Sequence, residues 1–202
     1  MPGSAAAQAP ATPALPKLPV YGEVGLGFGQ TLFRGATKAK LSQALGGSFR
    51  SGSGYNLMAG FYAAPAAWQG LGVGARIRGT FGTPGPAANN GDEYIFNYYN
   101  LAATAKYYPG GEFNRGFYGR GSLGFGQFTS KRLNDAARSY AHQYAIGSSV
   151  MLGAGYTLRR SSGLGLSLEA EYEHASRNGT VDQVGDVRFG SGQLGLNVIV
   201  SF

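Results

Sequence analysis

Charged side chains that alternate with apolar ones are the residues of this chain best suited to chemistry. In an extended strand, residues two apart point to the same face, so each such charge is predicted to lie on the face opposite the apolar side chains. Four are basic and four acidic, and a buried unpaired charge is very costly, so the pattern predicts ion pairs. The eight residues are Glu23, Arg76, Arg78, Lys106, Arg120, Glu169, Glu171 and Glu173.

A second candidate site combines a histidine, a hydroxyl and a carboxylate. His174 and Ser176 are two residues apart, and Asp182 and Asp186 follow within twelve residues of the histidine. A base, a hydroxyl and an orienting carboxylate are the components of a nucleophilic triad. The alternative interpretation is a polar strand end that enters a loop, and we favour it because a short motif without structural context is weak.

The composition excludes several other kinds of site. The 202 residues include 35 glycines but no cysteine and only two histidines. The absence of cysteine excludes disulfides, cysteine-ligated zinc and catalytic thiols. We therefore expect neither a metal nor a cofactor. The sequence also contains no run of 18 apolar residues, so it predicts no transmembrane helix.

The elements that must position the charges are eight segments with a period of two. Along each segment apolar residues alternate with small or polar ones, which is typical of strands. Residues 1–19, rich in alanine and proline, are expected to be a disordered tail left from a signal region or linker, and residues 20–202 form one domain. The predicted strands are Val20–Phe33, Tyr55–Ala64, Leu71–Phe81, Tyr94–Tyr108, Phe117–Phe128, Gln143–Leu158, Leu164–His174 and Phe189–Phe202.

The spacing of the strands and the glycines on their second face indicate a barrel that crosses a membrane. A soluble eight-stranded barrel would bury the apolar face and expose the glycine-rich face to water. Glycine is a poor residue for such a face, because it weakens a strand and has no side chain to cover the backbone. In a narrow lumen small residues are required. Short turns also alternate with longer loops. The fold class is therefore all-β: an eight-stranded antiparallel up-and-down transmembrane β-barrel with apolar side chains outward, short periplasmic turns and long extracellular loops.

Aromatic residues gather at both predicted ends of the strands, as expected of belts at the two membrane interfaces. The turn-end belt comprises Tyr21, Trp68, Tyr107, Tyr108, Phe117 and Tyr156, and the loop-end belt comprises Tyr55, Phe81, Tyr94, Phe125, Tyr144 and Tyr172. The long loops are Arg34–Gly54, Gly82–Glu93, Thr129–His142 and Ala175–Arg188, of which Thr129–His142 has a weak helical pattern.

The charged lumen has two interpretations. Opposite walls of an eight-stranded barrel are close enough for side chains to meet, and Arg76 and Arg78 are expected to pair with Glu169 and Glu171 near mid-height. The cluster is then either a gated or narrow polar channel, or a satisfied polar core that does not conduct. We favour the second, with a net lumen charge of zero.

Basic residues in the loops indicate an anionic partner at the membrane surface. The formal net charge is +7. A basic rim can bind the phosphates of lipopolysaccharide, and solvated loop charge is the alternative. Nucleic-acid binding is not expected, because no basic face with interleaved aromatics is present. The candidate lipopolysaccharide contacts are Arg34, Lys38, Lys40, Arg50, Lys131, Arg132 and Arg138.

The end of the chain carries a resemblance to a known group of proteins. Leu194, Leu196, Val198, Val200 and the terminal Phe202 alternate as in the small outer-membrane barrels of Gram-negative bacteria of the OmpA-transmembrane, OmpX, OmpW and opacity-protein type. The segments YNLAATAKYYPGG (99–111) and GLNVIVSF (195–202) resemble porin-family barrels of Bacteroidota. Phe202 is similar to the signal that such proteins present to the barrel-assembly machinery.

The resemblance implies an integral protein of the bacterial outer membrane with both termini in the periplasm. It implies outer-membrane lipids, lipopolysaccharide and the assembly machinery as partners, with a membrane-protein complex as a further possibility. The expected function is envelope structure or surface recognition through the loops, and the chain is not expected to be an enzyme. Outer-membrane lipid A deacylases similarly carry a His-x-Ser pair, but here Arg177 replaces their asparagine and Asp186 their glutamate.

Overall fold

Alternation of apolar and small residues produces eight strands in the protein. The computed structural model describes residues 19–33, 35, 38–39, 42–43, 52–82, 93–134, 139–159, 164–181 and 185–202. The predicted tail, residues 1–19, lies outside this part of the chain except for Pro19. The strands are β1 (Val20–Phe33), β2 (Ser53–Ala63), β3 (Leu71–Gly82), β4 (Glu93–Tyr107), β5 (Gly116–Asn134), β6 (Ser139–Arg159), β7 (Gly165–Val181) and β8 (Gly185–Ser201), with the 3-10 turn η1 (Ala66–Trp68) after β2.

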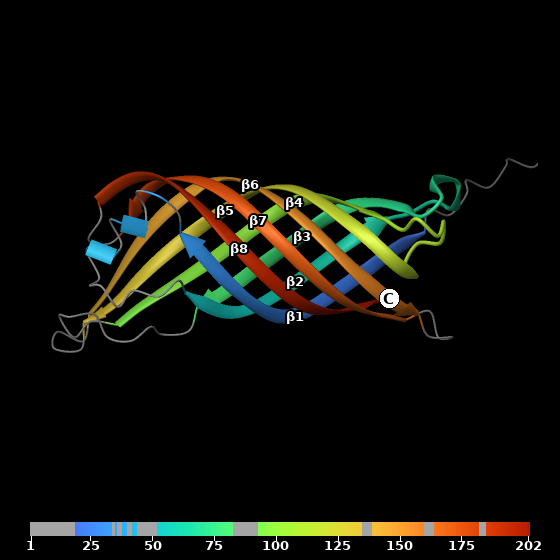
Figure 1. Ribbon diagram of the computed structural model, residues 1–202, viewed down its shortest axis with the longest axis horizontal. Helices are drawn as coiled ribbons and strands as arrows, with labels where there is room; N and C mark the ends of the chain where they lie inside the picture. The colour runs from blue at the N-terminus through green and yellow to red at the C-terminus, as the bar shows by residue number, and fades with distance from the viewer. Residues whose placement is uncertain are drawn as a thin grey trace, which may run out of the picture.

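Each strand pairs antiparallel with its neighbours in the sequence, and β1 pairs with β8 to close the barrel, which confirms the predicted fold class. Figure 1 shows the strands crossing obliquely around one long axis, with the C-terminus at the end where η1 lies. At the seam, the backbone N–H of Phe202 donates to the carbonyl of Gly22 at 3.0 Å, and the reverse bond measures 2.8 Å. The end of the chain is therefore paired with the start of β1.

The register determines the width of the barrel. Starting at Val24 on β1 and moving from each residue to its partner on the next strand, the path around the barrel reaches Gly190 on β8. Across the seam, however, Val24 pairs with Val200. One circuit of the barrel therefore shifts the register by ten residues. With about 3.3 Å per residue and about 4.8 Å between strands, this displacement gives a tilt of about 41° and a backbone radius of about 8 Å. Long side chains from opposite walls therefore meet at the axis.

Apolar side chains cover the outside of the barrel. Leu166, Leu168 and Val198 are 45%, 55% and 44% exposed, whereas a soluble barrel would bury them. Phe117 and Phe125 mark the two ends of the outer apolar surface on β5 and are about 20 Å apart along the axis at this tilt. This height is close to the band of ~25 Å found on outer-membrane barrels. No helix among the described residues is long and apolar enough to cross a membrane.

Two details of the predicted aromatic belts are wrong. Tyr108, expected on the outside, is fully buried inside the turn end, because it follows the last residue of β4 and the chain turns inward there. Tyr21 is half-buried and its ring packs on Phe113 at 4.9 Å. The loop-end residue Tyr94 has no described side chain.

Two of the predicted long loops are largely strand. The ladder between β5 and β6 continues to Asn134 and Ser139, and that between β7 and β8 to Val181 and Gly185. The weak helical pattern in Thr129–His142 therefore does not correspond to a helix in the described residues of that segment, which are strand. Beyond the apolar band both faces of a strand can be polar, so the alternation ends while the backbone pairing continues.

Candidate functional site

Eight predicted charges face the lumen and are buried there. They come from β1, β3, β4, β5 and β7, and every one is at most 4% exposed. Strands β3 and β7 lie on opposite sides of the eight-stranded circle, so their side chains point toward each other across the axis. The lumen is therefore filled from both walls.

The centre of the lumen is held by ion pairs between β3 and β7. Arg76 Nη1 lies 2.8 Å from Glu171 Oε2 and 3.6 Å from Glu169 Oε1. Arg78 contacts Glu171 at 2.6 Å and Glu173 at 2.8 Å. The structure thus brings together the four residues for which pairing was expected, and it adds Glu173.

The turn-end half of the network joins three further strands. Arg120 Nη2 lies 3.1 Å from Glu169 and 3.0 Å from Glu23, and Glu23 also pairs with Lys106. The Tyr62 hydroxyl donates to Glu23 at 3.1 Å. Glu23 therefore binds two bases and a phenol, which compensates the loss of its hydration.

Arg177 is a lumen residue that the sequence analysis missed. Its guanidinium is 2.9 Å from Glu173 and donates to the Ser191 hydroxyl at 2.7 Å, and the residue is 1% exposed. The apolar alternation predicts a strand that ends at His174, although Arg177 has the same parity as Glu169 and Glu173. Among the residues whose side chains the structure describes, the lumen holds five bases and four acids, so its net charge is one unit above the predicted zero.

The nine residues form one continuous chain of alternating sign, here called the charge ladder. Every carboxylate in it contacts two bases, so none of the four acids depends on a single partner. Removing one member of a buried pair typically costs about 3–5 kcal/mol, because the partner stays buried and uncompensated. In order from the loop end, the ladder is Arg177, Glu173, Arg78, Glu171, Arg76, Glu169, Arg120, Glu23 and Lys106.

Aromatic rings close the ladder at the turn end. Lys106, its last base, lies 5.0 Å from the centre of the Tyr62 ring and 4.8 Å from that of Tyr118. These contacts supply cation–π attraction where the lysine has only one carboxylate. The rings belong to the turn-end cluster, which comprises Tyr62, Ala64, Tyr108, Phe113 and Tyr118, with Tyr21 packed against it.

A second aromatic group, the loop-end cluster, lies at the opposite end of the ladder. It comprises Phe33, Phe96, Tyr98 and Phe128, all buried. Phe96 stacks on Phe128 at 5.5 Å, and the guanidinium of Arg177 lies 5.4 Å from the centre of the Tyr98 ring. Both terminal bases of the ladder thus contact aromatic rings, which accounts for the extra positive charge.

Amides and glycines fill the side of the lumen beside β1. Asn56 donates to Asn197 at 3.0 Å and accepts from Thr80 at 2.7 Å. A Cβ at Gly29 would lie 2.7 Å from Asn56 Oδ1, and one at Gly27 would lie 2.2 Å from the carbonyl oxygen of Leu196. The glycines of β1 therefore leave the space that this network occupies.

His174 and Ser176 lie on the outer wall of β7, both exposed. Ser176 pairs with Gly190 on β8, whereas the backbone of Asp186 pairs with Thr180. The backbone pair at Ser176 and the one at Asp186 are four residues apart along the strands, a distance of about 13 Å. The described backbone therefore does not bring these three residues together as a triad, and the side chain of Asp186 is outside the described part.

The other predicted residues lie near the two ends. Lys38 is exposed beyond the loop end, while Arg34, Lys40, Arg50 and Arg138 and the side chains of Lys131 and Arg132 lie outside the described residues. Phe202 is exposed at the turn end, where a Cβ at Gly22 would lie 2.5 Å from its ring. Within the described ranges, no group of three or more acidic or histidine side chains is placed to hold a metal ion.

Comparison with known proteins gives structural neighbours only. No family model matches the chain, and no curated protein matches it. Ail, the attachment invasion locus protein of Yersinia pestis, solved with the heparin analogue sucrose octasulfate, superposes with a TM-score of 0.57 at 14% identity, over 91% of this chain and 99% of Ail. Neisserial surface protein A gives 0.53 at 14% identity, over 91% and 97%. At this identity the likeness shows the fold, that of small outer-membrane barrels.

Proposed function

We propose that the chain is an integral outer-membrane protein with a closed lumen, acting in envelope structure or surface recognition through its loop end. The observation that carries this proposal is the charge ladder, which fills the axis between the two aromatic clusters. A solute would have to displace buried ion pairs that have lost their hydration. Activity is then left to the parts that face the membrane and the exterior.

A narrow pore for small solutes is the competing function, and conductance distinguishes the two. The purified chain in a planar bilayer is expected to be silent, whereas Glu171→Ala, which removes the carboxylate shared by Arg76 and Arg78, is expected to conduct. Glu112→Ala is the matched control, because Glu112 pairs with Arg115 at 3.1 Å on the exposed turn. Steady conductance by the unaltered chain would refute the closed lumen.

The proposed orientation places η1 and both termini in the periplasm. It is supported by the even number of strands and by the seam that joins Gly22 to Phe202 at the η1 end. The loop end would then face outward, and Phe202 would be presented to the barrel-assembly machinery. Protease added to intact cells is expected to cut a tag inserted between β1 and β2 but not one inserted at 110–111.

Strands β5 and β6 give the loop end its height. They comprise 19 and 21 residues, against 11 in β2. At the derived tilt each residue rises about 2.5 Å along the axis, so β6 is about 25 Å taller than β2. A hairpin of this height would extend well above a bilayer and is a suitable surface for recognition.

Polyanions such as the phosphates of lipopolysaccharide are the proposed partners of this end. Lys38 is exposed there, and the basic loop residues predicted from the sequence surround it in the chain. The neighbour Ail was solved with a polysulfated sugar, which is a related chemistry. Charge contacts of this kind weaken steeply with salt.

Binding of lipopolysaccharide to the barrel in nanodiscs tests this part of the proposal. Reversal of two bases, Lys38→Glu with Lys40→Glu, is expected to weaken binding and flatten its salt dependence. Arg115→Glu at the turn end is the control and is expected to leave binding unchanged. The double reversal lowers the net charge by four units and the control by two. A loss in Arg115→Glu about half that in the double variant would therefore show a nonspecific effect of net charge and would contradict the proposed site.

A further inference from the structure

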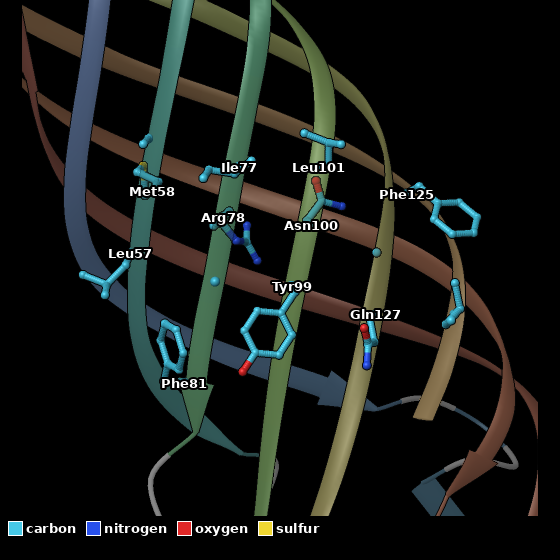
Figure 2. A pocket seen from close by; sticks show the side chains of 14 residues that line it. Leu57, Met58, Ile77, Arg78, Phe81, Tyr99, Asn100, Leu101, Phe125 and Gln127 are labelled. Atoms are coloured by element: carbon cyan, nitrogen blue, oxygen red, sulfur yellow. The ribbon is translucent and has the colours of Figure 1, made fainter. Parts of the chain in front are cut away.

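The outer wall of the barrel carries an apolar groove that none of the functions above uses. Its volume is about 630 Å³, and it crosses the outer faces of strands β2 to β6. Figure 2 shows Leu57, Phe81, Tyr99 and Gln127 side by side on neighbouring strands at this place. Arg78 and Asn100 also border it, but both are buried toward the lumen, so the groove is lined by the lipid-facing side chains.

A glycine forms the floor of the groove. Gly79 pairs with Leu57 on one side and with Tyr99 on the other, so a side chain is missing in the middle of an otherwise bulky row. A Cβ at this position would lie 2.9 Å from the Phe81 ring and 3.7 Å from that of Tyr99. The two rings meet edge to face at 5.8 Å and form the loop-end wall.

The register gives the groove its length and direction. The row runs from Leu57 through Gly79, Tyr99 and Gln127 to Ile146, four steps between strands. Four steps of about 4.8 Å make about 19 Å, and at the derived tilt the row climbs about 13 Å toward the loop end. It therefore begins within the apolar band and reaches the level of the loop-end aromatic side chains.

We propose that this groove binds one acyl chain of a lipid from the loop-side leaflet, an inference that rests on the proposed membrane location. At the depth of Leu57 and Ile77 a bilayer offers only hydrocarbon, and the lining is apolar and elongated as a chain requires. Just below the upper end, which Ile146 forms, the Tyr99 phenol and the Gln127 amide are at interface height, where they can donate hydrogen bonds to an ester carbonyl. The groove thus offers an apolar lining to an acyl chain and two hydrogen-bond donors near interface height.

Photo-crosslinking with a phosphatidylcholine that carries a diazirine on its acyl chain tests the site. The full chain is folded into vesicles, irradiated and digested, and adducts are located by mass spectrometry. Leu57, Ile77 and Leu101 are expected to carry severalfold more adducts than Leu168 and Leu196 on the opposite wall. Gly79→Leu fills the floor and is expected to abolish this excess.

Two further variants keep the result interpretable. Gly79→Ala adds a single methyl group and is expected to reduce the excess in part, with folding monitored by circular dichroism. Gly121→Leu, at a lipid-facing glycine with open space around its Cβ position, is expected to leave the excess unchanged. Uniform labelling around the barrel, or an excess that survives Gly79→Leu, would overturn the groove but not the membrane location.

Other outcomes separate the remaining alternatives. If the groove is labelled more weakly than the opposite wall and the protein elutes as a dimer in size-exclusion chromatography, a second copy covers the groove. This result would overturn the proposal. Absence of adducts from the whole outer wall would contradict the membrane location itself.

Discussion

Replacing Glu171 by glutamine tests whether the charge ladder stabilises the barrel. The carboxylate contacts Arg76 at 2.8 Å and Arg78 at 2.6 Å, and all three side chains are at most 2% exposed. Glutamine retains the volume, so no cavity forms, but both guanidiniums lose a countercharge. The ion pair that Arg76 keeps among the described residues is the longer one with Glu169, at 3.6 Å. The expected loss in the free energy of unfolding is about 3–5 kcal/mol.

The matched control is Glu112→Gln. Glu112 pairs with Arg115 at 3.1 Å, but the two side chains are 45% and 68% exposed. Solvent screens such a pair, and its contribution is about 0–1 kcal/mol. The same chemical change is therefore expected to have several times less effect when it is made outside the lumen.

Urea unfolding from lipid vesicles measures both values. The chain has one tryptophan, Trp68, at the turn end, so its fluorescence reports the transition without a label. The double variant Arg78→Met with Glu171→Gln is expected to show less than the sum of the two single losses, because the two side chains interact directly. If Glu171→Gln and Glu112→Gln differ by less than about 1 kcal/mol, the ladder does not stabilise the barrel as argued.

Three further changes test the ladder's end, the lumen space and the enzyme hypothesis. Arg177→Met is expected to lower the free energy of unfolding by about 1.5–3 kcal/mol in the same urea assay, because it removes charged hydrogen bonds. An unchanged free energy of unfolding would place Arg177 outside the network. Gly27→Ala, whose Cβ would lie 2.2 Å from a carbonyl oxygen, is expected to cost about 1–3 kcal/mol. Gly119→Ala has open space and is expected to change stability by less than about 0.5 kcal/mol, and equal effects would contradict the space argument. Neither the unaltered chain nor Ser176→Ala is expected to change the acyl content of lipopolysaccharide incubated with it. Release of acyl chains by the unaltered chain that Ser176→Ala abolishes would establish a hydrolase.

Parity along the chain predicted which charges enter the lumen. Glu169 and Glu171 alternate with Leu168 and Ala170, and a strand with one face in lipid leaves only one direction for a carboxylate. The same rule would have found Arg177 and Tyr62, which continue the inward parity of their strands. At Arg177 the polar end of β7 hides the alternation, and Tyr62 carries no charge, so a pattern of alternating charges does not mark it.

The height of β5 and β6 was not accessible to the same reasoning. Residues 129–134 and 139–142 are mostly polar and lack the apolar alternation of a strand, yet they pair as far as Asn134 and Ser139. Once a strand leaves the apolar band, backbone hydrogen bonds maintain it without an apolar face, so no hydrophobic pattern marks its end.

The sequence by itself determined the number of strands, the closed antiparallel class and the face on which each charge lies, because a period of two and a contrast in polarity are local properties of the chain. Only the tertiary structure decided that Glu171 bridges Arg76 and Arg78, that Lys106 and Arg177 end on aromatic rings, and that Gly79 forms a groove. These contacts join strands far apart in the sequence. They depend on a register displaced by ten residues around the barrel, which arises only when all eight strands close together.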